Sequence, residues 1–276
     1  MEVEMQTTEE ATAPPFIEVE HLTTGYEPGK PVLSDVSLTV RQGEFVCILG
    51  PSGCGKSTLL STLSGLMPPL EGTIRINQRD LYRDEIKKGE EPRLGYVFQD
   101  HRLLPWRTVA QNISLVLKAA GVPDADHEEI IRHYLRMLHI EQFYDSWPLN
   151  LSGGQRQRVS IARALAVDPL YVLMDEPFST LDEVTARTMR QELLEVWSES
   201  GKTIIFVTHS IREAVFLADR IFGLTTNPGR LYRTIDVDIP RIRDYEDLEI
   251  AQLEAEIIAD LLEEWGQAAP ARDGAG

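Results

Sequence analysis

One stretch constrains the fold of this chain more than any other, the run Gly50-Pro51-Ser52-Gly53-Cys54-Gly55-Lys56-Ser57-Thr58. It follows the apolar run from Phe45 to Leu49, which predicts a strand buried on both faces. It precedes the run from Leu59 to Leu63, which predicts the opening of a helix. A strand, a glycine-rich loop and a helix in this order, with the spacing G-x-x-x-x-G-K-S, are typical of a phosphate-binding loop.

The residue types in this loop suit a nucleotide. Glycines let the backbone curl so that several N–H groups point at phosphate oxygens, and the following helix adds the positive end of its dipole. Lys56 can reach the β- and γ-phosphates, and the Ser57 hydroxyl can bind Mg²⁺. The alternative is an ordinary glycine-rich turn, and the strand and helix that flank the loop argue against it.

Composition limits the class of partner. The net charge of −17 argues against general affinity for nucleic acid or for an anionic bilayer. No apolar run approaches the roughly 18–20 residues of a membrane span, and residues 1–15 carry acids but no Lys or Arg, unlike a secretory signal. We therefore expect a cytosolic chain with a disordered acidic tail at 1–15 and a flexible end at 267–276.

The two cysteines do not indicate a disulfide framework. Cys47 lies in the predicted buried strand, where we expect a small core residue. Cys54 lies in the phosphate loop, where backbone dipoles could lower its pKa. We interpret Cys54 as occupying a variable position rather than as a redox group.

Strands and helices alternate along most of the chain, which predicts an α/β fold with a parallel sheet covered on both faces. Ligands of such sheets bind at the carboxyl ends of the strands. The expected strands are 16–20, 36–40, 45–49, 72–76, 94–98, 170–174, 203–207 and 221–224, and the expected helices are 109–120 (with Thr108 as N-cap), about 130–138, 154–165, 184–198, 211–218 and 248–265.

Several polar side chains follow these strands directly. Asp175 can hold Mg²⁺ opposite Ser57, and Glu176 can act as the general base for an attacking water. Adjacent acids after a strand can also be a simple turn or helix cap. His209 could bridge the γ-phosphate and the water, although a lone histidine is more often structural, and the Gln99 amide can reach the metal or the water.

The run Leu151-Ser152-Gly153-Gly154-Gln155 provides a second anion-binding device, a Ser-Gly-Gly turn at a helix N-terminus. Two such devices with one nucleotide make sense if the second serves another subunit. The sequence therefore predicts a dimer with ATP between the protomers.

Together these motifs resemble the nucleotide-binding domain of an ATP-binding cassette (ABC) transporter. The resemblance covers roughly residues 16–240 and implies a P-loop NTPase (RecA-like) core with a parallel sheet, an antiparallel β subdomain and a helical subdomain at about 100–165, followed by an amphipathic helical extension at 241–266. It rests on Gly50–Thr58, Gln99, Leu151–Gln155, Leu170–Glu176, Ser179–Asp182 and His209.

The resemblance implies two domains head to tail, with each ATP held by Lys56 and Ser57 of one copy and by Ser152 and Gly154 of the other. It implies that Tyr26, which from spacing alone fits a packing role equally well, stacks on adenine, and that Asp182 senses the opposite copy. The expected nucleotide contacts are Tyr26, Gly50, Pro51, Ser52, Gly53, Cys54, Gly55, Lys56, Ser57, Thr58, Ser152, Gly153, Gly154, Gln155 and Asp182; the expected catalytic residues are Glu176, His209, Gln99 and Lys56; the expected magnesium ligands are Ser57, Gln99 and Asp175.

The segment from Leu103 to Val109 is similar to that of the nitrate, sulfonate and taurine importer ATPases, as are the segments Glu213–Arg220 and Pro240-Arg241. This similarity implies an ATPase at the cytoplasmic face of the cell membrane that energises uptake of a small anionic solute. Two membrane subunits would be direct partners, one docking a helix on Leu103, Leu104 and Trp106, and a solute-binding protein would act indirectly. Gln155 and Ser179-Thr180 depart from the Met and the Gly-Ala that are common in this branch, and Ser210 stands where many cassettes have Asp.

Two other functions compete with an importer. A non-transport cassette ATPase acting on DNA or ribosomes usually carries a coiled-coil insert or two cassettes, and this chain shows neither. An exporter or lipid-transport cassette would share the chemistry but lack the Leu-Leu-Pro-Trp segment. The final helix carries an apolar stripe from Ile250 to Trp265, so we expect it to pack on its own domain and to show its acids to water; a partner-binding helix is the alternative.

Overall fold

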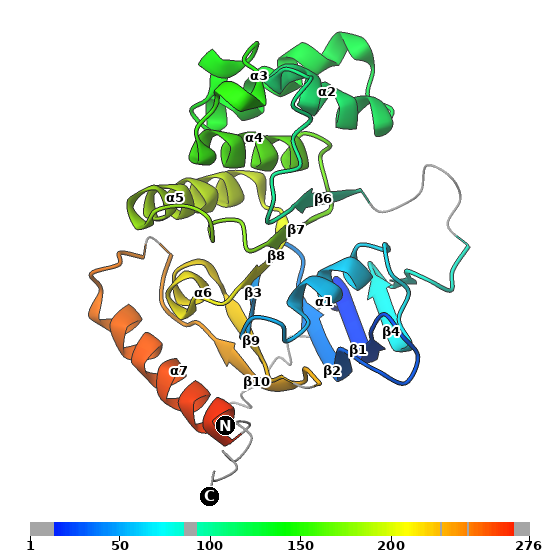
Figure 1. The fold of residues 1–276 in the computed structure, drawn as a ribbon, viewed down its shortest axis with the longest axis vertical. Helices are drawn as coiled ribbons and strands as arrows, with labels where there is room; N and C mark the ends of the chain where they lie inside the picture. The colour runs from blue at the N-terminus through cyan, green and yellow to red at the C-terminus, as the bar shows by residue number, and fades with distance from the viewer. Residues whose placement is uncertain (1–13, 86–92, 227, 242, 268–276) are drawn as a thin grey trace, which may run out of the picture.

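The apolar run before the phosphate loop forms the strand β3 (Phe45–Leu49) in the middle of a six-stranded sheet. The computed structural model describes residues 14–85, 93–226, 228–241 and 243–267, so the tail at 1–13 and the end at 268–276 lie outside the described residues. Figure 1 shows a helical lobe at the top, the six-stranded sheet in the middle and a smaller sheet beside α1 (Lys56–Leu63).

The six-stranded sheet has the order β10-β9-β3-β8-β7-β6. Of its five strand pairings four are parallel, and the pairing of β9 with the edge strand β10 is antiparallel. In the register of these strands Leu49 lies opposite Thr208, and Asp175 opposite Val207, so the strands end at one common edge. Besides β3, the strands are β6 (Leu94–Val97), β7 (Tyr171–Asp175), β8 (Thr203–Thr208), β9 (Arg220–Leu224) and β10 (Leu231–Asp236).

The smaller sheet is antiparallel, as the alternating sequence predicts. In β2 the residues Val36, Leu38 and Val40 are buried while those between them are exposed. This pattern places one face of the sheet on the core and the other in solvent. Its strands are β1 (Ile17–Thr24), β2 (Leu33–Val40), β4 (Glu71–Ile76) and β5 (Arg79–Asp80).

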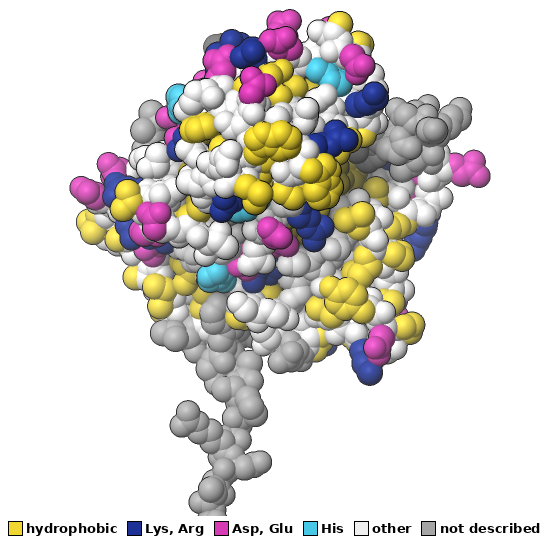
Figure 2. Space-filling model, turned by 45° about the horizontal axis from the view of Figure 1, so that its top comes forward, with side chains coloured by type: hydrophobic (Ala, Val, Ile, Leu, Met, Phe, Trp, Pro, Cys, Tyr) yellow, Lys and Arg dark blue, Asp and Glu magenta, His cyan; other side chains and the backbone are white. Residues whose placement is uncertain are grey.

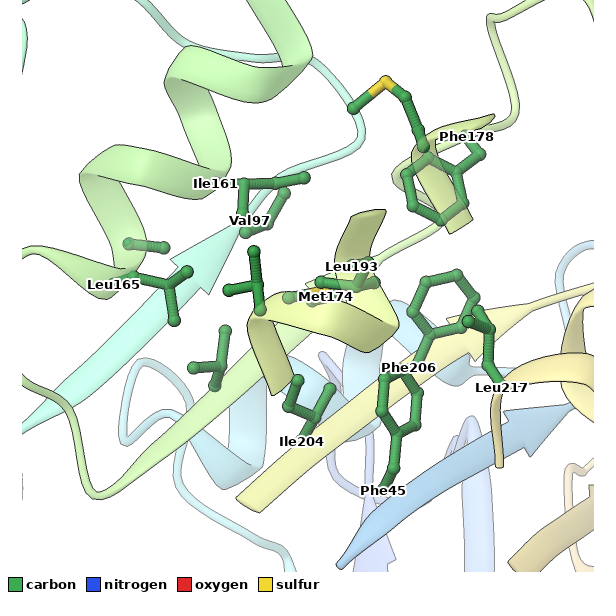
Figure 3. Packing of buried hydrophobic residues seen from close by; sticks show 14 of the residues in the cluster. Phe45, Val97, Ile161, Leu165, Met174, Phe178, Leu193, Ile204, Phe206 and Leu217 are labelled. Carbon is green, nitrogen blue, oxygen red and sulfur yellow. The ribbon is translucent and has the colours of Figure 1, made fainter. Parts of the chain in front are cut away.

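Two hydrophobic cores lie on opposite faces of the six-stranded sheet. Val46 and Ile48 of β3 belong to the core beneath the smaller sheet and α1, whereas Phe45, Cys47 and Leu49 belong to the core beneath the other helices. A strand with both faces covered has no polar positions, which is why β3 is a continuous apolar run. Figure 3 shows the second core, where side chains of four strands and of α4, α5 and α6 meet: Phe45, Val97, Met174, Ile204, Phe206, Ile161, Leu165, Leu193 and Leu217.

The helices begin where the sequence predicts, within about three residues. Thr108 caps α2 as expected: its hydroxyl accepts the Gln111 N–H at 3.3 Å, and its own N–H donates to the Gln111 side chain at 3.0 Å. The helices are α2 (Val109–Ala119), α3 (His127–Met137), α4 (Gly153–Leu165), α5 (Glu183–Ser200), α6 (Ile211–Leu217) and α7 (Leu248–Gln267), with 3₁₀ turns at Asp124–Asp126, Glu141–Phe143 and Pro148–Asn150.

The final helix α7 packs on its own domain beside α6, as predicted, and buries Ile250, Ile257 and Leu261. Ile258, expected in the same stripe, is 45% exposed. The prediction that the acids simply face water was wrong in part, because basic side chains of neighbouring elements pair with them: Arg212 with Glu254, and Arg233 with Glu256 and Asp260. Among the described residues no helix combines the length and apolarity needed to cross a bilayer.

Candidate nucleotide site

The phosphate loop curls between β3 and α1 because glycine occupies the positions where a side chain would not fit. Gly55 has a φ of 106°, and a Cβ there would lie 2.8 Å from a methyl carbon of Leu33. Gly50 is equally restricted, since its Cβ would lie 2.7 Å from the Cys54 sulfur. Glycine at both positions is therefore required by the tight path of the backbone, as a phosphate cradle needs.

Lys56 lies inside this loop with only 4% of its side chain exposed. Its ammonium donates to the carbonyls of Gly50 at 2.8 Å and Pro51 at 3.0 Å. The same nitrogen lies 3.3 Å from Glu176 Oε1, which brings the end of β7 against the loop. A buried ammonium held at this point can bind a phosphate oxygen that enters the loop.

Ser57 and Asp175 face each other across the space between α1 and β7, and the Ser57 hydroxyl donates to Asp175 Oδ1 at 3.1 Å. Burial raises the pKa of the Asp175 carboxyl, and this hydrogen bond opposes the shift. A hydroxyl beside a carboxylate is a donor set that suits a hard cation such as Mg²⁺. In the described part of the chain no group of three or more His, Cys, Asp or Glu side chains is arranged to bind a metal.

Glu176 leaves the strand in a different direction from Asp175. Its φ is 42°, in the left-handed region that non-glycine residues rarely adopt, and its N–H donates to the Val207 carbonyl at 3.0 Å. Strained backbone of this kind is found at functional sites. The carboxylate lies between Lys56 and His209, with Oε2 2.9 Å from His209 Nδ1.

Gln99 and Tyr26 lie at the rim of this site. Gln99 is exposed and comes two residues after Val97, which pairs with Met174 in β7, so it belongs to the same sheet edge as Asp175. Tyr26 is 76% exposed, and its hydroxyl oxygen lies 3.5 Å from the Thr58 hydroxyl of α1. An exposed ring beside the phosphate loop is available for stacking on a base.

The second anion device lies elsewhere in the fold. Ser152 caps α4: its hydroxyl accepts the Gln155 N–H at 3.3 Å, and its own N–H donates to the Gln155 side chain at 2.8 Å. Asp182 caps α5: its carboxylate accepts both the N–H and the hydroxyl of Thr185, and these hydrogen bonds lower the pKa of the carboxyl. Figure 1 shows α4 in the upper lobe, apart from α1, so one copy of the chain does not bring the two devices together.

Comparison with known proteins identifies the family. The family model of ABC transporters matches residues 33–179. An uncharacterized ABC transporter ATP-binding protein of Methanocaldococcus jannaschii is 41% identical over 251 residues, which cover 90% of this chain and 92% of the relative. The chain belongs to the ABC transporter ATP-binding proteins. The taurine import ATP-binding protein TauB of Escherichia coli is 40% identical to this ABC protein over 226 residues, 82% of this chain and 86% of TauB.

Solved structures agree with this assignment. A dimeric post-hydrolysis structure of an ATP-binding cassette, bound to ADP and phosphate, matches with a TM-score of 0.71 at 32% identity over 81% of this chain and all of that one. The structure of cbiO1 from Clostridium perfringens, part of the ABC transporter complex cbiONQ, matches with a TM-score of 0.74 at 27% identity, over 92% of this chain and 97% of cbiO1. The predicted α/β P-loop fold is thus confirmed, and the protein is an ATP-binding ABC ATPase.

The lowered pKa suggested for Cys54 in this ABC ATPase is not found. The side chain is 1% exposed, and burial raises the pKa of its thiol, outweighing the charge of Lys56 and the backbone hydrogen bonds that lower it. Its sulfur turns toward Gly50 rather than toward solvent. Cys47 is fully buried, as predicted for a core residue.

Sequence reasoning missed three buried polar residues beside His209 and Asp182, namely Thr208, Glu213 and Arg190. Glu213 is the third residue after the N-cap Ser210, and the pattern Ser-x-x-Glu is a signal that could have marked it. The contact of Arg190 with Glu213 has no such local signal, because Glu213 lies on another helix.

Proposed function

We propose that this chain is the ATP-hydrolysing subunit of an ABC importer that takes up a small anionic solute of the nitrate, sulfonate or taurine kind. The observation that carries the proposal is the segment Leu103–Val109, which is similar to that importer branch and adjoins an open groove of the helical lobe. The 40% identity to a taurine import ATP-binding protein supports the same branch.

The proposed roles follow from the contacts at the sheet edge. The triphosphate binds in the loop Gly50–Thr58. There the Lys56 ammonium leaves its contact with Glu176 and binds the β- and γ-phosphates instead. The freed carboxylate of Glu176 orients a water and takes its proton as the water oxygen attacks the γ-phosphorus and the bond to the β-phosphate oxygen breaks. His209 donates to the γ-phosphate, and the Gln99 amide contacts the water or the metal.

Ser57, Asp175 and Gln99 are the residues that would hold Mg²⁺. A bound magnesium ion would neutralise part of the charge on the phosphates. The residues of the chain fix the two oxygen ligands in advance, because Ser57 is held by α1 and Asp175 by the buried strand β7.

The complete site needs a second copy of the ATPase, head to tail with the first. The N-terminus of α4 of that copy would cover the γ-phosphate through Ser152, Gly153, Gly154 and Gln155. Asp182 would sense the opposite copy. Ser152 is exposed at the start of a helix of 13 residues, as this role requires. The dimeric cassette with ADP and phosphate supports this arrangement.

The membrane subunits would dock on the helical lobe. A groove of about 320 Å³ between β6, α2 and α4 is lined by Tyr96, Phe98, Leu104 and Leu115. Trp106, in the same segment as Leu104, is 68% exposed, and hydrophobic side chains gather on this lobe in Figure 2. An amphipathic helix of a membrane subunit fits such a surface, which would place the ATPase peripherally at the cytoplasmic face of the cell membrane, with a solute-binding protein acting on the other side.

The proposed domain division follows from these roles. Residues 16–240 form the ATPase domain, in which about 100–165 are the helical lobe that couples the site to the membrane subunits. Residues 241–266 form a helical extension, which packs on the ATPase domain through α7.

Reconstitution tests the proposal. The chain should co-purify from membranes with two permease subunits, and the complex in liposomes should take up taurine, a sulfonate or nitrate when ATP is supplied. Glu176→Gln should retain ATP binding and lose about 10²–10⁴-fold in hydrolysis, the usual contribution of a general base. Trp106→Ala should weaken recovery on membranes while the hydrolysis rate of the isolated chain stays unchanged.

Other outcomes would contradict the importer. Recovery with ribosomes or DNA would favour a non-transport ATPase, and ATP-driven release of solute or lipid from the liposomes would favour an exporter. A wild-type hydrolysis rate in the Glu176→Gln variant would show that Glu176 is not the general base.

A further inference from the structure

An ion network with a buried arginine at its centre joins two segments of the proposed ATP site. Arg190 of α5 is 2% exposed. Its Nε donates to the Ala186 carbonyl at 3.1 Å and its Nη2 to Glu183 Oε1 at 2.8 Å. Its Nη1 lies 3.7 Å from Glu213 Oε1, on α6. Because Glu183 directly follows Asp182, Arg190 connects the start of α5 with Glu213.

Glu213 in turn holds the chain on both sides of His209. The Thr208 hydroxyl donates to Glu213 Oε2 at 2.5 Å and accepts the N–H of Ser210 at 3.0 Å. Thr208 and Ser210 are the two chain neighbours of His209, so a single hydroxyl, aligned by one carboxylate, fixes the backbone from which the imidazole projects. The imidazole itself is 52% exposed and contacts Glu176. Its direction therefore depends on its backbone more than on packing around the ring.

The C-terminal extension covers the Arg190–Glu213 end of the network, whereas the Glu183 side chain at the other end is 69% exposed. Tyr245 is stacked on Phe216 with ring centroids 4.0 Å apart, and its ring lies 5.2 Å from the Arg190 guanidinium. Arg187 and Arg212 lie 4.8 Å from the same ring. A polar interaction shielded in this way, here that between Arg190 and Glu213, is electrostatically stronger than an exposed one.

A buried ion pair can also be purely structural, and an apolar pair of similar volume can be as stable. The placement of this pair argues for more than stability. Its two ends attach to the residues next to His209 and next to Asp182, both at the carboxyl edge of the sheet.

We propose that Glu213 and Arg190 are positioning residues for His209, an inference that rests on the proposed role of His209 in hydrolysis. Glu213 aligns the Thr208 hydroxyl and thereby the His209 backbone, while Arg190 holds Glu213 against the first turn of α5. Losing this alignment displaces the imidazole from the γ-phosphate, and a displacement of about 1 Å can lower a rate on the order of 10²-fold. Binding of ATP in the loop Gly50–Thr58 does not depend on the network.

The test measures single-turnover phosphate release and ATP affinity on the full-length chain. Glu213→Gln and Arg190→Met should each lower the rate by about 10- to 100-fold and change the dissociation constant of ATP by less than about twofold. In a His209→Ala background the same substitutions should lower the rate no further, because they act through His209. Thr208→Val should lower the rate of phosphate release in the same way. Thr208→Ser, which keeps the hydroxyl, should retain most of that rate.

A second buried pair provides the matched control. Arg220 donates to Glu44 at 2.7 Å. This pair lies at the amino ends of the parallel strands β9 and β3, at the edge of the sheet opposite to that of His209. Glu44→Gln should lower thermal stability as Glu213→Gln does, yet leave the hydrolysis rate unchanged.

The two proposals fail in different ways. A wild-type rate for Glu213→Gln, or an equal loss with and without His209, would overturn the positioning role while leaving His209 in place. A wild-type rate for His209→Ala would instead remove the proposed role of His209 itself, and with it the residue that the network is said to position.

Discussion

Arg243 lies between β10 and α7, is 5% exposed, and anchors the C-terminal extension to the ATPase domain. Its guanidinium donates to main-chain carbonyls at the end of α6 and in the segment after β10: Val215, Phe216, Ala218, Val237 and Ile239. A cation at a helix C-terminus is favourable because the last carbonyls lack partners in the helix. Burial, together with the charge of Arg241, lowers the pKa of Arg243 to about 10.

The cost of replacing Arg243 by Met follows from these contacts. Methionine fills most of the space but donates no hydrogen bond, and a buried carbonyl left without a donor costs about 1–3 kcal/mol. Partial access of water to the segment after β10 offsets some of this loss. We therefore expect Arg243→Met to lower the free energy of unfolding by about 3–5 kcal/mol. Arg243→Lys, with three donors on one nitrogen, should lose less.

Urea denaturation followed by circular dichroism measures this change. The control is Arg136→Met, since Arg136 is 58% exposed and lies 3.6 Å from Glu141, a surface pair that contributes about 0–1 kcal/mol. If Arg243→Met were as stable as Arg136→Met, the carbonyls would not depend on the guanidinium, and the anchoring role would be refuted.

Three further substitutions or reactions test the fold and the loop. Gly95→Ala should lower the unfolding free energy by about 1–3 kcal/mol in the same titration, because a Cβ on β6 would lie 2.6 Å from the Ala164 carbonyl of α4; an unchanged midpoint would show that the contact relaxes. Thr108→Ala should cost about 1 kcal/mol through loss of the α2 cap, whereas Thr108→Ser should cost much less. A thiol reagent at pH 8 should modify Cys54 only as the protein unfolds, since burial raises its pKa; rapid reaction of the native protein would contradict this.

Much of the fold and the phosphate loop could be predicted because the signals are local. The strand β3 is a run of five apolar residues before a glycine-rich loop, and Thr108 starts α2 with a side chain that closes a capping box. Asp175 and Glu176 were expected at a ligand-binding edge because both directly follow a buried run. Each of these features is decided within about ten residues of sequence.

Features that depend on distant contacts were not predictable in this way. Arg190 meets Glu213 only because α5 and α6 pack together, and no spacing in the sequence records that contact. The strand β10 was missed because its residues are only partly buried, so that alternation is weak at this edge of the sheet. For Cys54, burial of the sulfur decides the pKa, and the sequence does not show which way a loop side chain turns.

The most direct test of the central claim, an ATP site completed by a second copy, is the mass of the Glu176→Gln variant by size-exclusion chromatography with light scattering. ATP should convert the 31.1 kDa chain into a particle of twice that mass. Adding Ser152→Phe, which leaves the phosphate loop of each copy intact, should abolish the dimer while each chain still binds ATP. A dimer that forms regardless of Ser152, or a variant that stays monomeric with ATP bound, would contradict the composite site.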